Sequence, residues 1–299
     1  MNHLDRAITK LLKPITSKMP CGNEIRNDKT LDSTYYAIKN ARRAARDIER
    51  HNTTAEVQTN ELPAWKTVAD LIEDCLLNNC KDLELVCWLC EAWCRIYDIE
   101  GVYYGLMLIR RLLLKYKTKL HPIEPTTSQT SLQSFINLNG NERPGALPNA
   151  INNIMLINCD NITLRTSDLH CLIKSNEFAD KCDKIDIKYL SSRITILKDT
   201  VDEYTLLCST LNKFENTQAL PTSYIKNSIT ELHELVKLII NKHHNRNELN
   251  HHSVDDVQED PDFDKFTRYF KWIDSSISTM IANLFPVSAR SSGQISDIV

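Results

Sequence analysis

The chain has 299 residues and a mass of 34.4 kDa, and its 36 basic and 39 acidic residues give a formal net charge of −3. This balance of charge gives the chain no overall positive surface of the kind that binds nucleic acid. The sequence also contains no run of about 18 apolar residues, so no membrane-spanning helix is expected. Glycine supplies only 6 residues, about 2% where about 7% is usual, which disfavours Rossmann folds, phosphate-binding loops and nucleophile elbows. We therefore predict an all-α fold.

Apolar residues recur at steps of three and four along the first part of the chain, which predicts amphipathic helices. The first covers residues 4–12, and it is typical of a helix rather than of a signal peptide because charged residues interrupt it. A non-helical stretch over residues 14–28 follows. The next helix is predicted at about 31–50, and polar residues 52–62 form the loop after it.

Three more helices are predicted before residue 122. Pro63 suits the first turn of one of them. A second follows Asn79 and runs to about residue 97, and Gly101 is expected to break the pattern before the third, which reaches Tyr116. Because the breaks are short, we expect these helices to be antiparallel neighbours in a bundle.

The pattern changes after residue 123, where proline, threonine, serine and asparagine indicate a connector with a short helix at 147–157. Helical spacing returns at 190–207 and 225–239, and a last helix is predicted at 266–281. The predicted organisation is a helical-bundle N-terminal domain over residues 1–125, a connector over 126–165, a second and smaller helical domain over 166–286, and a flexible tail over 287–299.

Cysteine is frequent, with ten residues, and Cys87 and Cys90 form a CxxC pattern with Cys94 nearby. A structural zinc site needs four ligands on turns, and a redox CxxC opens a helix after a strand. Here the pattern lies inside a predicted apolar helix, so we interpret these cysteines as core residues. Without an export signal, the cysteines are expected to stay reduced in a cytoplasm.

Histidine pairs at 243–244 and 251–252 are candidate metal ligands. Their polar surroundings favour a solvated turn instead. The acidic residues Asp260, Asp262 and Asp264 resemble the start of a calcium loop, but the glycine and the bidentate glutamate of that loop are missing. A metal-dependent helical enzyme that uses the region of His243 and His251 is therefore the least favoured alternative.

The helix predicted at 31–50 carries a basic stripe formed by Lys39, Arg42, Arg43, Arg46 and Arg50. Asp47 and Glu49 interrupt it and no aromatic residues alternate with it, so nucleic-acid binding is disfavoured. We interpret the stripe as a solvated helix face, with a protein-partner patch as the second interpretation. No sequence signature of a catalytic triad, HExxH zinc site, Walker A loop or dinucleotide site occurs, so we predict no enzyme activity, cofactor or metal.

Five stretches, taken in order, resemble the ImpA N-terminal domain of TssA, a component of the bacterial type VI secretion system. They are Pro20-Cys21-Gly22 with Glu24, Arg26 and Asp28; Trp65; Asp82 with Trp88; Gly101 with Gly105; and Tyr116 with His121-Pro122. Physical reasoning agrees, because Gly22 suits a turn, Asp82 can cap a helix, and the GxxxG of residues 101–105 allows close backbone packing.

The resemblance implies a non-enzymatic scaffold that docks on the baseplate or the membrane complex and helps prime assembly of the tail tube and sheath. The N-terminal domain would dock through exposed helix faces and the loop of residues 20–28, against protein partners and without nucleic acid or membrane insertion. The implied location is the cytoplasm, with recruitment to the inner membrane through partners. A generic cytoplasmic helical adaptor is the alternative.

Two departures from the family pattern stand out. Lys117 occupies a position where the family has tryptophan, so one aromatic anchor is lost. The family also has a C-terminal domain responsible for ring-like oligomers, and residues 293–299 resemble only the beginning of that region. The sequence is thus expected to be a short variant or a truncated one, and its oligomeric state is left open.

Overall fold

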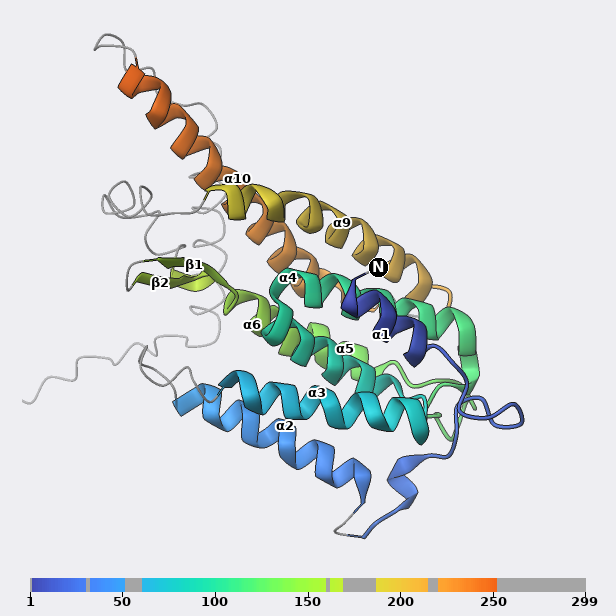
Figure 1. Cartoon of the computed structure of the whole chain (residues 1–299). Coiled ribbons are helices and arrows are strands. Elements are labelled where there is room, and N and C mark those ends of the chain that lie inside the picture. Colours follow the sequence, from blue (N-terminus) through green and yellow to red (C-terminus); the bar gives the residue numbers. More distant parts are fainter. Residues whose placement is uncertain are drawn as a thin grey trace, which may run out of the picture. The chain divides into compact units, whose positions relative to one another are not determined.

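The computed structural model describes residues 2–30, 33–51, 61–159, 162–168, 187–214 and 220–251. Among these residues the chain is mostly α-helical, with one two-stranded antiparallel hairpin, which confirms the all-α prediction (Figure 1). Residues Met1–Asn247 form one compact unit. The part of the second unit, Glu248–Val299, that the structure describes is the end of the last helix.

Three helices open the fold: α1 (His3–Leu11), α2 (Thr34–His51) and α3 (Glu61–Asn78). In α1, Leu4, Ile8 and Leu11 form a buried stripe at helical spacing, as predicted. A single turn of 3₁₀ helix, Ile25–Asn27, lies in the loop between α1 and α2. Helix α3 packs against α2, α1 and the next helix, which joins the three to the core.

The central element is α4 (Leu83–Tyr116), which is a helical hairpin rather than one straight helix. Its two halves meet at Asp98, whose backbone is non-helical with φ 53°. In one continuous helix, Gly101 and Trp93 would lie about 12 Å apart along the axis, because they are eight residues apart. Here they are in contact, since a Cβ atom at Gly101 would collide with the backbone of Trp93. The two halves therefore run antiparallel and in close contact (Figure 1).

The predicted break at Gly101 is thus wrong in position, because the chain turns three residues earlier. Gly101 and Gly105 lie inside the second half of α4, where they face Trp93 and Cys90 of the first half. Glycine is needed at both places because a side chain would keep the two backbones apart. The prediction that residues 101–105 permit close packing is confirmed.

After α4 the chain forms a 3₁₀ turn (Lys117–Lys119), α5 (Gln133–Asn139), α6 (Ala146–Asn152), β1 (Met155–Cys159) and β2 (Ile162–Arg165). Helices α5 and α6 pack on α4 through buried side chains such as Phe135, Leu147 and Ile151. The short helix predicted at 147–157 exists, but it ends at Asn152 and β1 follows. The hairpin was not predicted.

Two long helices complete the described residues: α9 (Ile187–Leu211), which packs along α4, and α10 (Ser223–His251). Both were predicted from their spacing. The turn predicted around the histidine pairs is wrong, because α10 continues to His251, and no proline or glycine interrupts it. The predicted helix at 266–281, the acidic residues 255–264 and the predicted tail lie outside the described residues.

None of the helices within the described ranges is both long enough and apolar enough to cross a membrane. The division into an N-terminal domain, a connector and a middle domain stays a prediction.

Candidate functional site

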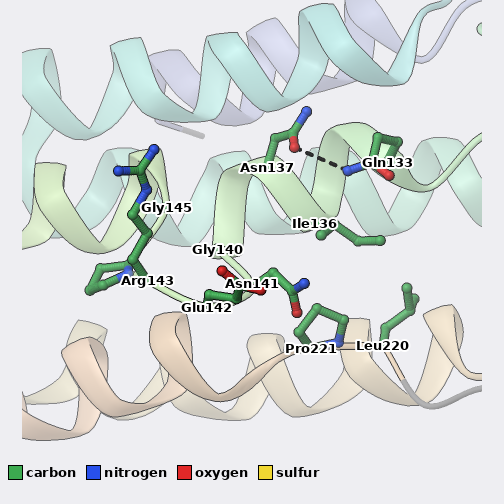
Figure 2. A pocket seen from close by; sticks show the side chains of 11 residues that line it. Gln133, Ile136, Asn137, Gly140, Asn141, Glu142, Arg143, Gly145, Leu220 and Pro221 are labelled. Carbon is green, nitrogen blue, oxygen red and sulfur yellow. Dashed lines mark hydrogen bonds between the residues drawn. The ribbon is translucent and has the colours of Figure 1, made fainter. Parts of the chain in front are cut away.

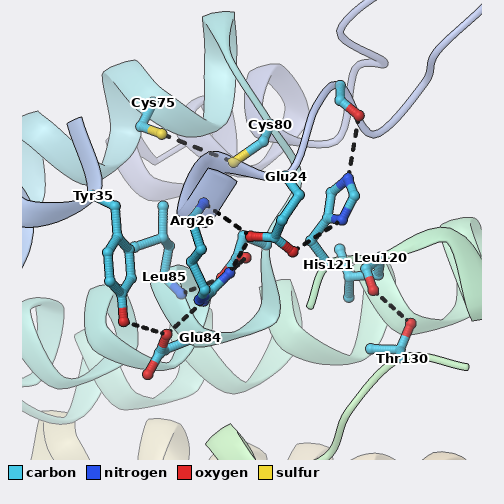
Figure 3. A network of polar contacts seen from close by, with 12 residues as sticks. Glu24, Arg26, Tyr35, Cys75, Cys80, Glu84, Leu85, Leu120, His121 and Thr130 are labelled. Atoms are coloured by element: carbon cyan, nitrogen blue, oxygen red, sulfur yellow. Dashed lines mark hydrogen bonds and ion pairs between the residues drawn. The ribbon is translucent and has the colours of Figure 1, made fainter. Parts of the chain in front are cut away.

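Four residues at the start of α4 and in the first loop form an ion-pair cluster that we name the Arg26 cluster: Glu24, Arg26, Asp82 and Glu84 (Figure 3). Nη1 of Arg26 donates to Glu24 Oε1 at 2.7 Å and to Asp82 Oδ2 at 2.6 Å. Its Nη2 donates to Glu84 Oε2 at 2.5 Å. Partial burial alone would lower the pKa of Arg26, but the three carboxylates outweigh it and raise that pKa.

Asp82 is fully buried and also begins α4, since its Oδ1 accepts a hydrogen bond from the backbone N–H of Leu85 at 3.0 Å. Backbone hydrogen bonds hold the neighbouring segments in place. Lys81 N donates to Cys21 O at 2.8 Å, and His121 N donates to Lys81 O at 3.0 Å. The cluster therefore fastens the first loop and the segment after α4 to the start of that helix.

His121 extends this cluster toward Gly22. Its Nε2 lies 3.1 Å from the carbonyl oxygen of Gly22, and its Nδ1 lies 3.4 Å from Glu24 Oε2. Both oxygens can only accept, so the doubly protonated imidazolium suits the site better than either neutral tautomer. The interaction with Glu24 raises the pKa of His121. Partial burial opposes ionisation of Glu24, but hydrogen bonds from His121 and Arg26 lower its pKa to about 2.

Tyr35 on α2 links the Arg26 cluster to the aromatic core. Its hydroxyl donates to Glu84 Oε2 at 3.1 Å, and the guanidinium of Arg26 lies 4.8 Å from the centre of its ring. The ring also stacks on Trp88 at a centroid distance of 5.9 Å. Helix α2 is thus attached to α4 through a side chain that the sequence analysis did not select.

A second ion-pair cluster lies two turns along α4, around Glu91, whose side chain is 0% exposed. We name it the Glu91 cluster: Glu91 with Arg42, Arg46 and Arg95. Arg42 Nε donates to Glu91 Oε2 at 2.8 Å, and Arg46 Nε donates to Oε1 at 2.9 Å. Burial opposes ionisation of Glu91, but the three guanidiniums outweigh it and lower its pKa. Arg95 also pairs with Glu49 of α2 at 2.6 Å.

The prediction of a solvated basic stripe on α2 is therefore wrong for part of the stripe. The side chain of Arg42 is only 16% exposed because it turns inward to Glu91. Arg43 and Arg50, at 83% and 71%, do face solvent. A buried carboxylate 49 residues away in the sequence explains the difference, and the stripe alone could not reveal it.

The tryptophans of the motif stretches lie beneath these arginines. Arg95 lies 4.2 Å from the centre of the Trp65 ring, and Arg42 lies 4.8 Å from that of Trp88. Both rings are buried, Trp65 at 1% exposure and Trp88 at 9%. Both rings therefore support the Glu91 cluster from the core side.

The remaining motif residues are mostly structural. The Tyr116 hydroxyl donates to the backbone carbonyl of Leu12 at 2.8 Å, which ties the end of α4 to α1. Asp28 is exposed, and it accepts from the backbone and hydroxyl of Thr30. The other motif residues are buried or partly buried: Pro20, Cys21, Gly22, Gly101, Gly105 and Pro122. A partner-binding role for the motif residues stays a prediction.

Sequence reasoning missed Tyr35, Glu84, Glu91 and Arg95. Only Glu91 left a usable signal, because it is a lone carboxylate in a run of apolar residues from 85 to 94. A charge in such a position must be paired if the helix is buried all round. The other three are ordinary polar positions on helix faces, and only the fold shows what they contact.

The cysteines of the CxxC region are core residues, as predicted. Cys75, Cys80, Cys87, Cys90 and Cys94 are all buried. Burial raises the pKa of the Cys87, Cys90 and Cys94 thiols, which keeps them protonated. His243 lies within α10, and the structure describes no group of three or more potential metal ligands in the ranges it covers.

Two hollows border the loop between α5 and α6. The first, about 820 Å³, lies between this loop and the residues that precede α10, Leu220 and Pro221 (Figure 2). The second, about 760 Å³, lies between α2, the first half of α4, α6 and Arg165 of β2. Arg143 contributes to both, and in Figure 2 its side chain points away from Pro221.

Comparisons with known proteins agree with the resemblance found in the sequence. Residues 12–140 match the family described as ImpA, N-terminal, type VI secretion system. Among solved structures, the chain resembles the N-terminal domain, including the conserved ImpA_N region, of the TssA component of the type VI secretion system from Burkholderia cenocepacia, with a TM-score of 0.60 and 19% identity. The likeness covers 79% of this chain and 94% of that one, and it shows a common fold. No curated protein matches the sequence.

Proposed function

We propose that this TssA-like chain, in which residues 12–140 form an ImpA N-terminal domain, serves the type VI secretion apparatus as a non-enzymatic assembly scaffold. It docks on the baseplate or the membrane complex and helps prime assembly of the tail tube and sheath. It works in the bacterial cytoplasm and is recruited to the inner membrane through its protein partners.

The observation that supports this proposal most is that the motif residues hold the loop and the helices of the matched region together. The Arg26 cluster, His121 and the paired glycines fix the loop and helices of the matched region to one another. Interfaces gain affinity when the binding partner is already ordered, because less conformational entropy is lost on association. A domain whose loop and helices are held together in this way is already ordered before binding, as a docking module with contact residues on its surface should be.

The loop of residues 14–28 offers such a contact. Ile15 N donates to Pro20 O at 2.9 Å, and Met19 N donates to Thr16 Oγ1 at 2.9 Å, so the loop has a defined shape. Met19, in the turn of this loop, is 49% exposed. A flexible apolar side chain on an ordered loop is a common feature of protein interfaces.

The proposal is tested by isolating the tagged full-length chain from cells that assemble a type VI apparatus, and by identifying the co-purified proteins by mass spectrometry. We expect baseplate, sheath or membrane-complex proteins, and a loss of about tenfold for Met19→Glu, as for an interface anchor of about 1.4 kcal/mol. Leu206→Glu is the matched control, since Leu206 is 52% exposed but lies on α9, outside residues 12–140. Recovery of none of these proteins would sink the proposal.

A further inference from the structure

The second hollow is lined mainly by charged side chains, and we name it the arginine cleft. Its volume is about 760 Å³, within the range of ligand pockets. The arginines that line it are Arg42, Arg46, Arg50, Arg95, Arg143 and Arg165. Three glutamates also line it: Glu49, Glu84 and Glu91. The lining therefore carries three more positive than negative charges.

Internal ion pairs reduce this excess but do not remove it. Arg50 pairs with Asp47, and Glu84 shares Arg26 with Glu24 and Asp82, so counting these four groups as well leaves one net positive charge. Arg143 is exposed, and Arg165 donates to the amide oxygen of Asn153 at 3.2 Å. The backbone N–H of Arg165 donates to Asp168 Oδ2 at 2.9 Å, but neither guanidinium pairs with a carboxylate of the described residues. The cleft thus has two cations available at its α6 side.

The electrostatics of the α2 side point the same way. Burial, together with the positive charges of Arg46 and Arg95, lowers the pKa of Arg42 although Glu91 is beside it. Arg42, Arg46 and Arg95 share two carboxylates, Glu91 and Glu49, which leaves one net positive charge at the open side of the cluster. An additional negative group in the cleft would relieve this repulsion.

We propose that the arginine cleft is the docking site for an acidic segment of a partner protein. The segment presents aspartate or glutamate carboxylates to Arg143 and Arg165, and Trp88 contributes to the wall of the cleft beside it. Arginine forms planar, two-point hydrogen bonds with carboxylates, which fixes the register of such a segment. The inference rests on the proposed function for the source of the partner, a type VI secretion protein, but not for the chemistry of the site.

The cleft suits an acidic protein segment better than a nucleic acid. Three glutamates lie among the arginines and would repel a continuous row of phosphates, whereas separate carboxylates can be placed between them. The whole chain is also acidic, with a net charge of −3. A hollow of this size exceeds what a single small anion fills, so a segment with several side chains fits it better.

The test uses the full-length chain and a fluorescein-labelled oligoglutamate peptide, with oligoglutamine and a short single-stranded DNA as comparison probes. The cleft variant is Arg143→Glu with Arg165→Glu. The matched control is Arg6→Glu with Arg111→Glu, which makes the same change of charge at two exposed arginines on α1 and the second half of α4. Thermal unfolding checks that both variants are folded.

We expect oligoglutamate, but not oligoglutamine, to bind, and its affinity to fall about tenfold in the cleft variant only, as the loss of two solvent-accessible charge pairs implies. Equal affinity for wild type and cleft variant, or no binding of oligoglutamate, overturns the proposal. Tighter binding of DNA through the same arginines also overturns it.

A second arm separates this proposal from the proposed function. Overlapping peptides from the baseplate, sheath and membrane-complex proteins of the same system are tested against the same three proteins. If acidic peptides bind and the cleft variant loses them, both proposals are supported. If type VI peptides bind equally to the cleft variant, only the cleft proposal fails. If oligoglutamate depends on the cleft but no type VI protein binds, the proposed function fails and the cleft remains.

Discussion

The first half of α4 carries two ion-pair clusters with opposite composition. In the Arg26 cluster, one arginine lies among three carboxylates, whereas in the Glu91 cluster one carboxylate lies among three arginines. The three carboxylates raise the pKa of Arg26, whereas burial, reinforced by the charges of Arg46 and Arg95, lowers the pKa of Arg42. The two clusters are connected through Tyr35 and Trp88.

The difference in composition between the two clusters indicates that arginine–carboxylate pairs stabilise the fold in one and can also bind a partner in the other. The Arg26 cluster joins the first loop, the start of α4 and His121. Both terminal nitrogens of Arg26 donate to carboxylates within the chain. The Glu91 cluster borders an open cleft, where further arginines have no carboxylate partner among the described residues. We therefore assign the first cluster to stability and the second to stability and binding.

The largest expected effect is that of Glu91→Gln. Removing the carboxylate leaves three guanidiniums facing one another in a partly buried site, which costs about 3–5 kcal/mol of unfolding free energy. Urea unfolding measures it. Glu100→Gln is the control, because Glu100 pairs with Arg193 at 3.2 Å on a more exposed surface and its loss costs about 0–1 kcal/mol. Equal costs for the two variants would show that Glu91 does not hold the arginines.

The next largest effect is expected for Arg26→Lys. The charge is kept, but lysine cannot donate to Asp82 from two nitrogens while it also contacts Glu24 and Glu84. We expect a loss of about 2 kcal/mol in urea unfolding. Arg6→Lys, an exposed arginine of α1, should change stability by less than about 0.5 kcal/mol. If Arg26→Lys is as harmless as its control, the cluster needs only a positive charge.

The pH dependence of stability separates the two clusters further. The raised pKa of His121 contributes stability that is fully present below its ordinary value of 6.5 and is lost as the pH rises through the raised value. Glu24 contributes stability that is present above 4.5 and is lost as the pH falls toward 2. His121→Gln should remove the alkaline decline, as measured by urea unfolding on both sides of 6.5. An unchanged decline in this variant would assign it to other groups.

The smallest effect is expected for Tyr35→Phe, which removes the hydroxyl that contacts Glu84 but keeps the ring on Trp88. The loss should be about 1 kcal/mol, the typical net contribution of one hydrogen bond, because solvent can partly replace the contact with Glu84. Tyr36→Phe is the neighbouring control. A loss as large as that of Arg26→Lys would mean that the two clusters act as one unit.

The sequence predicts well what depends on local spacing. The buried stripe of α1, the burial of Cys87 and Cys90, and the close packing at Gly101 follow from periodicity and residue size. The helical class also follows, since the chain is poor in glycine and rich in regular apolar spacing. The spacing and size of the residues in each segment are enough to indicate these features, whichever segment packs against them.

The sequence fails where distant residues decide the outcome. Arg42 is buried because Glu91, 49 residues away, accepts its hydrogen bonds. The break in α4 falls at Asp98, where antiparallel packing of the two halves imposes a positive φ that no local signal predicts. The polar composition around the histidine pairs suggests a turn, yet helix-compatible residues without proline or glycine continue α10.

The most direct test of the account is the affinity of the oligoglutamate peptide for two variants, Arg26→Lys and Arg143→Glu with Arg165→Glu, at a temperature where both are folded. Arg26→Lys should bind as the wild type does although it is less stable, and the cleft variant should bind about tenfold more weakly at unchanged stability. The account is contradicted if Arg26→Lys loses the peptide while folded, or if the cleft variant keeps it.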